Sequence, residues 1–519
     1  MIVSGYWPSQ APYAEFPLPE LLHRTAERFG DKPALIGADG TTRTYRELWS
    51  SAGKVARFLQ DHGIEKGDKV GIYSPNHVDY ASVFYGILLA GATVTTLNPL
   101  YREREIAHQL DDAEAVALFV FSPVAAAVEA ARQHLPRLRH VWPMDNLSDL
   151  LGGVSEEHRP VAINAREDVA VLPYSSGTTG LPKGVMLTHY NITCNIKQGL
   201  ATELLTPDSV GLYVLPFFHI YGMVVLMGTG LALGSTGVVM MRFDVEQMMH
   251  LIGQYKITNL YLAPPAMLAM ANVPNPSRFD TSSLRLVGSA AAPLPPEVGE
   301  RVRSIYGCPV AQGYGMTETS PATNITPLAR IKLEACGPPL ADTFEKVVSL
   351  ETGQELAAGE VGELMVKGPQ VMKGYWKRPE ETRECLTEDG WLRTGDIGHL
   401  DEDGYLYLLE RKKEMIKYKG YQVAPAELEA VLHEHPAVLD AAVIPKPHLE
   451  GGEIPKAFVV LREGFEASPE ELMAFVAEKV APYKKIREVE YLTEIPKTAT
   501  GKILRRDLIE QERRKGKKG

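Results

Sequence analysis

From its start to about residue 340 the chain alternates helical and strand patterns, and this alternation constrains the fold more than any other feature. Apolar residues recur at helical spacing in three segments, and short apolar runs lie between and after them. The predicted helices are 18–29, 45–62 and 78–90, and the predicted strands are 32–36, 69–73, 169–174, 257–262, 284–287 and 310–312. Helices and strands that alternate in this way predict an α/β domain with doubly wound parallel sheets.

The pattern changes after about residue 340, where short alternating runs are separated by Gly and Asp turns. These runs, at 344–349, 362–366 and 404–409, predict a β-rich, barrel-like subdomain at about 340–409. Six charged residues then fall within 410–417. We place a hinge at 410–414, between a large N-terminal domain, 1–409, and a C-terminal domain, 415–519.

The C-terminal domain reads as small and α+β. Its predicted elements are helix 425–433, strand 439–444, strand 456–461, helix 468–480 and strand 488–491. The basic tail 513–519 is expected to be disordered.

Composition sets broad limits on function. The 519 residues are 45% hydrophobic and 23% charged, which is ordinary for a soluble globular protein. A net charge of −11 argues against nucleic acid as a partner. The four cysteines are scattered and predict free thiols, and no apolar run approaches the ~20 residues of a membrane span. With no secretory signal at the start, we expect a cytoplasmic protein.

A glycine-rich loop runs from Tyr174 to His189 and holds three glycines, several hydroxyl residues and Lys183. Such a loop suits a polyphosphate, because glycine lets backbone N–H groups approach closely and lysine adds a point charge. The spacing is neither that of a Walker A loop nor that of a dinucleotide fingerprint. By composition alone the segment also fits a plain flexible connection.

The whole run resembles the phosphate-binding signature of the adenylate-forming superfamily, which includes acyl-CoA synthetases, 4-coumarate–CoA ligases, beetle luciferases and peptide-synthetase adenylation domains. Further signatures at 288–293, 312–318, 391–396 and 496–502 follow in the family's order, so the resemblance covers nearly the entire chain. Within this superfamily, the sequence most resembles bacterial fatty acyl-CoA synthetases. The resemblance implies that the N-terminal domain binds ATP and an acid, and that the C-terminal domain is mobile.

The resemblance also implies nucleotide contacts. Adenine would lie along 289–292 and stack on Tyr314, Thr317 would touch the α-phosphate, and Asp396 would accept both ribose hydroxyls. Glu410 stands where many relatives carry Asp, which keeps the charge. The implied ATP- and AMP-binding residues are Ser175, Ser176, Gly177, Thr179, Gly180, Lys183, Ser289, Ala290, Ala291, Ala292, Gly313, Tyr314, Gly315, Thr317, Asp396 and Arg411.

Catalytic, coenzyme A and acid-binding positions follow from the same resemblance. The catalytic set is Lys502, His219, Glu318 and Thr178, with Glu318 as the Mg²⁺ ligand. Coenzyme A (CoA) would meet Lys417, Lys419, Gly420 and Gln422, and Lys413 would be the hinge residue. The acyl pocket would contain Tyr221, Gly222, Met316 and Ser320.

These residues imply an AMP-forming acid–thiol ligase. A carboxylate is a poor electrophile, and forming an acyl-adenylate makes AMP the leaving group; cations and N–H donors must then converge on the ATP phosphates. Lys502 would serve this first step and leave before the CoA thiol attacks.

The acid is the least constrained part. Neither 210–227 nor 319–323 holds an Asp to anchor an α-amino group, which favours an apolar acid, such as a medium- or long-chain fatty acid. A 4-coumarate-like aromatic acid is the alternative, followed by a stand-alone adenylation protein or a non-catalytic AMP-binding protein. Oligomeric state and peripheral membrane contact are left open.

Overall fold

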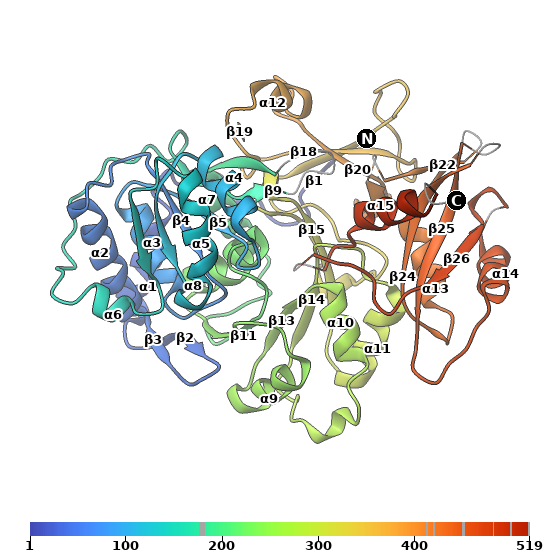
Figure 1. Ribbon diagram of the computed structural model, residues 1–519, viewed down its shortest axis with the longest axis horizontal. Coiled ribbons are helices and arrows are strands. Elements are labelled where there is room, and N and C mark those ends of the chain that lie inside the picture. The colour runs from blue at the N-terminus through green and yellow to red at the C-terminus, as the bar shows by residue number, and fades with distance from the viewer. Residues whose placement is uncertain are drawn as a thin grey trace.

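The computed structural model describes residues 1–175, 182–411, 414–418, 421–448, 452–480, 482–498 and 501–516. Its strands form four sheets, two of eight strands and two of five. Figure 1 shows the C-terminal domain, in orange and red, at one end of the molecule and the blue and cyan helices at the other. The predicted fold class is confirmed: large α/β sheets, a β-rich part and a smaller α+β domain.

The first eight-stranded sheet has the order β19-β10-β8-β5-β4-β6-β7, with β9 paired to β10. Its strands are β4 (Lys69–Tyr73), β5 (Thr93–Leu97), β6 (Ala115–Val120), β7 (His140–Pro143), β8 (Val169–Val171), β9 (Tyr174–Ser175), β10 (Lys183–Thr188) and β19 (Gly374–Tyr375). The pairs from β8 through β7 are parallel, whereas β10 is antiparallel to its neighbours. Strands β9 and β10, on either side of residues 176–181, pair antiparallel, with Ser175 opposite Lys183.

The second eight-stranded sheet has the order β16-β15-β14-β13-β11-β12-β2-β3. Its strands are β2 (Pro33–Gly37), β3 (Thr42–Thr44), β11 (Val210–Tyr213), β12 (Thr236–Val239), β13 (Asn259–Leu262), β14 (Leu286–Ser289), β15 (Val310–Gly315) and β16 (Ala322–Ile325). Only the outer pairs β2–β3 and β15–β16 are antiparallel. Ligands of open α/β sheets bind at the carboxyl ends of such strands.

Helices cover these sheets. They are α1 (Pro19–Phe29), α2 (Tyr45–Asp61), α3 (Tyr80–Leu89), α4 (Glu103–Asp112), α5 (Ala125–Ala131), α6 (Leu147–Leu150), α7 (His189–Leu200), α8 (Thr229–Leu233), α9 (Val245–Tyr255), α10 (Pro264–Ala271), α11 (Pro296–Tyr306) and α12 (Pro379–Cys385). Short 3₁₀ turns occur at Ser122–Val124, Arg132–His134, Pro276–Arg278, Thr317–Thr319 and Leu328–Arg330. Helix α3 is apolar nearly all round and is buried along almost its whole length, as expected of a core helix.

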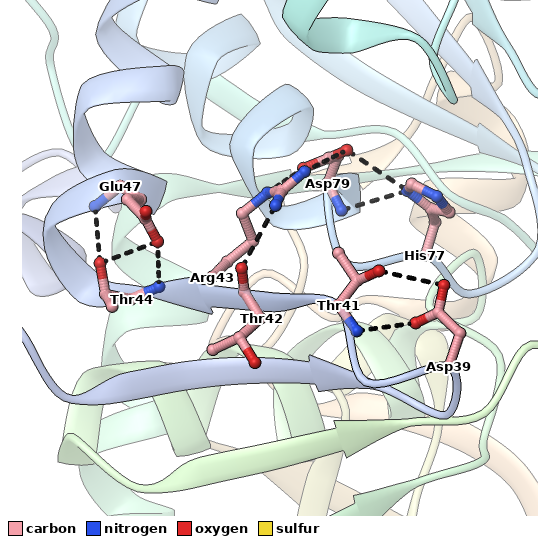
Figure 2. A network of polar contacts seen from close by, with 8 residues as sticks. All are labelled: Asp39, Thr41, Thr42, Arg43, Thr44, Glu47, His77 and Asp79. Atoms are coloured by element: carbon pink, nitrogen blue, oxygen red, sulfur yellow. Dashed lines mark hydrogen bonds and ion pairs between the residues drawn. The ribbon is translucent and has the colours of Figure 1, made fainter.

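Helix α2 shows how local sequence sets an element boundary. Thr44 at its N-cap accepts a hydrogen bond from the Glu47 N–H at 3.2 Å, and the Glu47 carboxylate accepts from the Thr44 N–H at 2.8 Å. Figure 2 shows this reciprocal pair, which satisfies two N–H groups that the helix start leaves unpaired. The predicted start at residue 45 is confirmed.

The β-rich part is an antiparallel sheet with the order β1-β17-β18-β20-β21. Its strands are β1 (Ile2–Ser4), β17 (Phe344–Val348), β18 (Gly362–Lys367), β20 (Leu392–Leu400) and β21 (Leu406–Arg411). The barrel-like form we expected is wrong, because the order is that of an open sheet with β1 and β21 at its two edges. The sheet also takes its first strand from the chain start, which pairs Val3 with Glu345.

The C-terminal domain holds a second five-stranded sheet, β23-β22-β25-β24, with β26 paired parallel to β25. Its elements are β22 (Ile416–Tyr418), β23 (Tyr421–Val423), α13 (Pro425–His433), β24 (Val438–His448), β25 (Gly452–Leu461), α14 (Pro469–Lys479), a 3₁₀ turn (Pro482–Lys484), β26 (Glu488–Tyr491) and α15 (Arg505–Gly516).

Helix α15 corrects our expectation of a disordered basic tail for residues 513–516, while 517–519 lie outside the described residues. It continues through Arg513 to Gly516, because Leu508 is buried at 1% exposure and the Glu512 carboxylate pairs with Lys456 at 2.6 Å. Among the described residues, no helix is long and apolar enough to cross a membrane. The domain boundaries stay predictions, since the hinge residue Lys413 lies outside the described residues.

Candidate active site

A cavity of about 1130 Å³ collects most of the described site residues. The residues predicted for the site that line it are Ser175, Lys183, His219, Tyr221, Ser289, Ala290, Ala291, Gly313, Tyr314, Gly315, Met316, Thr317, Glu318 and Lys502. They come from both eight-stranded sheets and from the C-terminal domain. Segments far apart in sequence thus meet in one cavity.

One side of the cavity, which we call the polar wall, consists of Ser175, Lys183, Glu318 and Tyr375. The Glu318 carboxylate accepts a hydrogen bond from the Tyr375 hydroxyl at 2.8 Å and from the Ser175 hydroxyl at 3.4 Å. Burial and the nearby Glu318 charge raise the pKa of Tyr375, which keeps its hydroxyl a donor. Lys183 Nζ lies 3.9 Å from the carboxylate of Glu381 on α12.

The polar wall fits one hard cation held together with phosphates. Among the described residues there is no group of three or more His, Cys, Asp and Glu side chains that resembles a complete protein metal site. Mg²⁺ usually binds through one or two carboxylates and the phosphates of its nucleotide. Glu318, at 6% exposure and lining the cavity, supplies such a carboxylate.

Strand β14 and the segment after it form a narrow part of the cavity. A Cβ atom on Gly288 would lie 2.6 Å from the Tyr261 ring, so only glycine allows this approach. The Ser289 hydroxyl is buried without a hydrogen-bond partner in the protein. Buried hydroxyls are normally paired, so this one is available to a ligand. Ala290 and Ala291 line the cavity, whereas Ala292 does not.

Tyr314 and Asp396 lie together, one on β15 and the other on β20. The Tyr314 hydroxyl donates to the Asp396 carboxylate, which is 5% exposed. Asp396 does not line the cavity, although its neighbours Thr394 and Gly395 do. The register of the β-rich sheet pairs Asp396 with Arg411 on the adjacent strand.

Another part of the cavity lining, which we call the apolar wall, consists of Phe218, His219, Tyr221, Val225 and Tyr261. His219 Nδ1 accepts a hydrogen bond from the Tyr221 N–H at 3.3 Å. His219 lines the cavity, and desolvation by the surrounding protein lowers its pKa to about 4. His219 is therefore a neutral imidazole whose Nε2 carries the proton. Burial also raises the pKa of Tyr221 and Tyr261.

Two predicted acyl-pocket residues do not line this cavity. Gly222, in the π-helix Tyr221–Gly228, lies against backbone, because a Cβ there would be 2.2 Å from Pro216 O. Ser320 is fully buried and its hydroxyl donates to Gln370 O at 2.8 Å. The acyl-pocket role of both residues stays a prediction, and it is their neighbours Tyr221 and Pro321 that line the cavity.

Lys502 reaches the cavity from the C-terminal domain. A Cβ on Gly501 would lie 2.6 Å from Pro265 at the start of α10, so the Lys502 loop runs directly against the large domain. Lys502 Nζ lies 3.9 Å from the Glu414 carboxylate, which also pairs with Arg505 at 3.1 Å. Arg505 is held in turn by Glu429 at 2.7 Å.

Sequence reasoning missed Tyr375 and Glu414. Glu414 stands in the charged run 410–417, and we assigned it only to the hinge at 410–414. Tyr375 carried no sequence signal, because it reaches Glu318 through the tertiary fold.

Several predicted residues cannot be placed. Ser176, Gly177, Thr178, Thr179, Gly180, Lys413, Lys419 and Gly420 lie outside the described residues. Lys417 and Gln422 are paired across β22 and β23, which fixes their backbone positions only.

Comparison with known proteins decides the family. The family model for AMP-binding enzymes matches residues 22–376, and the model for the C-terminal domain of AMP-binding enzymes matches residues 427–502. The chain belongs to the AMP-binding enzyme family. As a member of this adenylate-forming family, it is an AMP-forming acid–thiol ligase that uses ATP.

Individual relatives of this AMP-binding enzyme cover nearly its whole length. It is 40% identical to 4-coumarate–CoA ligase 1 of Petroselinum crispum, over 95% of this chain and 93% of the relative. It is 36% identical to a long-chain-fatty-acid–CoA ligase of Bacillus subtilis, over 98% of this chain and 97% of the relative. Among solved structures, an anthranilate CoA ligase in complex with anthranoyl-AMP is similar with a TM-score of 0.91 and 28% identity, over 96% of this chain and 97% of that chain.

Proposed function

We propose that this enzyme activates an apolar carboxylic acid, a medium- or long-chain fatty acid, as its acyl-adenylate and then transfers the acyl group to the thiol of CoA. The first step releases pyrophosphate and the second releases AMP. The observation that carries the proposal is the single cavity in which Glu318 and Lys502 meet the apolar wall.

In the first step, the acid carboxylate attacks the α-phosphorus of ATP and displaces pyrophosphate. Lys502 would bridge the carboxylate and the α-phosphate, and Thr317 would donate a hydrogen bond to the same phosphate. Mg²⁺, held by Glu318, would supply positive charge to the phosphates. Lys183 and the loop residues Ser175, Ser176, Gly177, Thr178, Thr179 and Gly180 would bind the β- and γ-phosphates.

The remaining nucleotide contacts are those that the family resemblance implies. Tyr314 would stack on adenine, the segment from Ser289 to Ala291 would border the ring, and Asp396 with Arg411 would hold the ribose. The unpaired Ser289 hydroxyl supports a polar ligand at this point. His219, as a neutral donor, would hold the acid carboxylate at the apolar wall.

In the second step, the CoA thiol attacks the acyl carbonyl, the acyl–oxygen bond to phosphate breaks, and AMP leaves with the electron pair. Lys502 lines the cavity, so it would have to withdraw before the thiol enters. Rotation of the C-terminal domain at Lys413 would bring Lys417, Lys419, Gly420 and Gln422 to the site. A Lys413→Pro variant, which fixes φ, should accumulate acyl-adenylate with little thioester; normal turnover would reject the rotation.

An aromatic acid is the second candidate, and the 40% identity to a 4-coumarate–CoA ligase favours it. The apolar wall also contains Phe218, Tyr221 and Tyr261, which suit a flat ring as well as an aliphatic chain.

Pyrophosphate release with decanoate or 4-coumarate, each with and without CoA, tests the proposal. We expect release with decanoate, and decanoyl-CoA plus AMP when CoA is present. Pyrophosphate release with 4-coumarate but not with decanoate would favour the second candidate, an aromatic acid. Binding of AMP with no acid-dependent release would instead indicate a non-catalytic AMP-binding protein.

A further inference from the structure

The segment that carries His219 and Tyr221 has little secondary structure to hold it. It leaves β11 at Tyr213, runs as irregular backbone through 214–219, and enters the π-helix at Tyr221. The two cavity-lining side chains are therefore only as well placed as this irregular backbone. Something other than a sheet ladder has to fix it.

Asn76, in the loop after β4, supplies most of that support. Its Oδ1 accepts a hydrogen bond from the Phe217 N–H at 2.7 Å. Its Nδ2 donates to Leu215 O at 3.0 Å and to Tyr213 O at 3.2 Å. The side chain is 4% exposed, so these bonds form where water cannot replace them. One buried amide thus holds both N–H and C=O groups of the segment before His219.

Thr96 on β5 holds the same segment from another strand. Its hydroxyl donates to Phe218 O at 2.6 Å, one residue before His219. Thr96 is 4% exposed and does not line the cavity. Strands β4 and β5 belong to the first sheet, whereas β11 belongs to the second. Asn76 and Thr96 therefore bridge the carboxyl ends of strands from two sheets.

The loop that carries Asn76 is itself fixed at its far end. Arg43 on β3 binds Asp79 through two hydrogen bonds, Nε to Oδ1 at 2.7 Å and Nη2 to Oδ2 at 3.3 Å. The Asp79 N–H also donates to His77 Nδ1 at 3.2 Å. Figure 2 shows these contacts around Asp79, which is 6% exposed. A bidentate pair of this kind, in which the Asp79 side chain is 8% and the Arg43 side chain 30% exposed, restricts the loop that carries Asn76.

We propose that Asn76, together with Thr96, is a positioning residue that sets the placement of His219 and so determines how well the acid is held for adenylation. Neither side chain reaches the cavity, and the effect acts through the backbone of 213–219. The inference rests on the proposed function for the role of His219, whereas the hydrogen-bond brace itself does not depend on it. A displacement of about 1 Å at a reacting group costs up to roughly 10²-fold in rate.

The test uses Thr96→Val, Thr96→Ser and Asn76→Ala in the full chain. Thr96→Val removes one hydroxyl without changing volume, and Thr96→Ser restores that hydroxyl. Thr236→Val is the matched control, because Thr236, at 8% exposure against 4% for Thr96, is also buried on a strand and donates to a backbone oxygen, Pro33 O at 2.8 Å, away from the cavity. Kinetics of decanoate-dependent pyrophosphate release and hydrogen–deuterium exchange of 213–221 are measured for each variant.

We expect Thr96→Val to lower kcat/KM for decanoate roughly 10-fold and Asn76→Ala by more, with KM for ATP unchanged. Thr96→Ser and Thr236→Val should keep wild-type kinetics, although Thr236→Val lowers Tm. Exchange in 213–221 should quicken only in Thr96→Val and Asn76→Ala. Wild-type decanoate kinetics in Thr96→Val, or an equal loss for ATP and acid, would overturn the inference.

The two proposals fail in different ways. If the wild-type enzyme releases no pyrophosphate with any acid, the proposed function fails, and the exchange measurement still decides the brace. If hydrogen–deuterium exchange of 213–221 is unchanged in both Thr96→Val and Asn76→Ala, the hydrogen bonds of Asn76 and Thr96 do not hold this segment, whatever the activity of the variants.

Discussion

The polar wall and the apolar wall of the cavity are built in different ways. Ser175 and Lys183 flank one short loop, and Glu318 lies in a compact motif at 312–318. The apolar wall instead combines the irregular segment at 218–219, the π-helix and Tyr261 on β13. Phosphate binding depends mainly on local backbone geometry and so leaves a contiguous sequence signature. An apolar pocket depends on which distant side chains converge.

The two walls also differ in the charge they tolerate. Carboxylate and ammonium groups lie on the polar wall, whereas burial at the apolar wall lowers the pKa of His219 to about 4 and raises that of Tyr221. The apolar wall thus disfavours charge on its own side chains. It suits an uncharged chain whose only charged end, the carboxylate, meets the neutral imidazole of His219 and the ammonium of Lys502.

Loss of Lys502 should give the largest effect and separate the two chemical steps. Lys502→Ala removes the ammonium that stabilises charge in adenylation, so acid-dependent pyrophosphate release should slow by roughly 10²-fold or more. Thioester formation from pre-made acyl-adenylate should survive. The control is Lys479→Ala in the same domain, which breaks a surface pair with Glu434 and a cation–π contact with Phe475, both away from the cavity. Equal damage to both steps would contradict the role of Lys502.

Loss of the Tyr375 hydroxyl should give a smaller effect, confined to the polar wall. Tyr375→Phe removes the hydrogen bond to Glu318, and such a bond to a charged group contributes about 1.5–3 kcal/mol. We expect a roughly 10-fold loss in pyrophosphate release and a higher Mg²⁺ requirement, with the preference among acids unchanged. Tyr405→Phe is the control, because its hydroxyl donates to Arg330 O away from the cavity. A changed acid preference in Tyr375→Phe would show that the walls are not independent.

The pH dependence of kcat/KM for the acid tests the apolar wall, and here we expect His219 to have almost no effect on the profile. Because burial lowers the pKa of His219 from 6.5 to about 4, the imidazole stays neutral from pH 8 down to about pH 5. His219 should therefore cause no inflection near pH 6.5 in the pH profile of kcat/KM for the acid. An inflection there that disappears in His219→Asn would mean that the imidazole titrates normally.

Much of the fold could be predicted from the sequence. The residues of the polar wall could be predicted better than those of the apolar wall. The predicted helix 425–433 and strands 69–73 and 488–491 are confirmed to the residue, because each has a clear periodicity and clear flanks. Strand β1 was missed, since its partner β17 lies more than 300 residues away. Helix α15 was missed because its charges suggested disorder, whereas their pairing partners, such as Glu490, lie on other elements.

Site predictions follow the same division. The polar-wall residues Ser175, Lys183 and Glu318 were found from motifs, and the structure brings them together. Gly222 and Ser320 were assigned to the acyl pocket from the family resemblance, and it is their neighbours Tyr221 and Pro321 that line the cavity. Asn76 and Thr96 carried no motif, because their role arises only where two sheets meet.

The acid preference tests the central claim most directly, namely that an apolar wall selects the acid by burial. The measurement is kcat/KM for straight-chain acids from butyrate to palmitate, beside 4-coumarate and benzoate. We predict a rise of up to ~0.8 kcal/mol, or about 4-fold, for each buried methylene until the pocket ends. A preference for either aryl acid over every aliphatic acid would contradict the account.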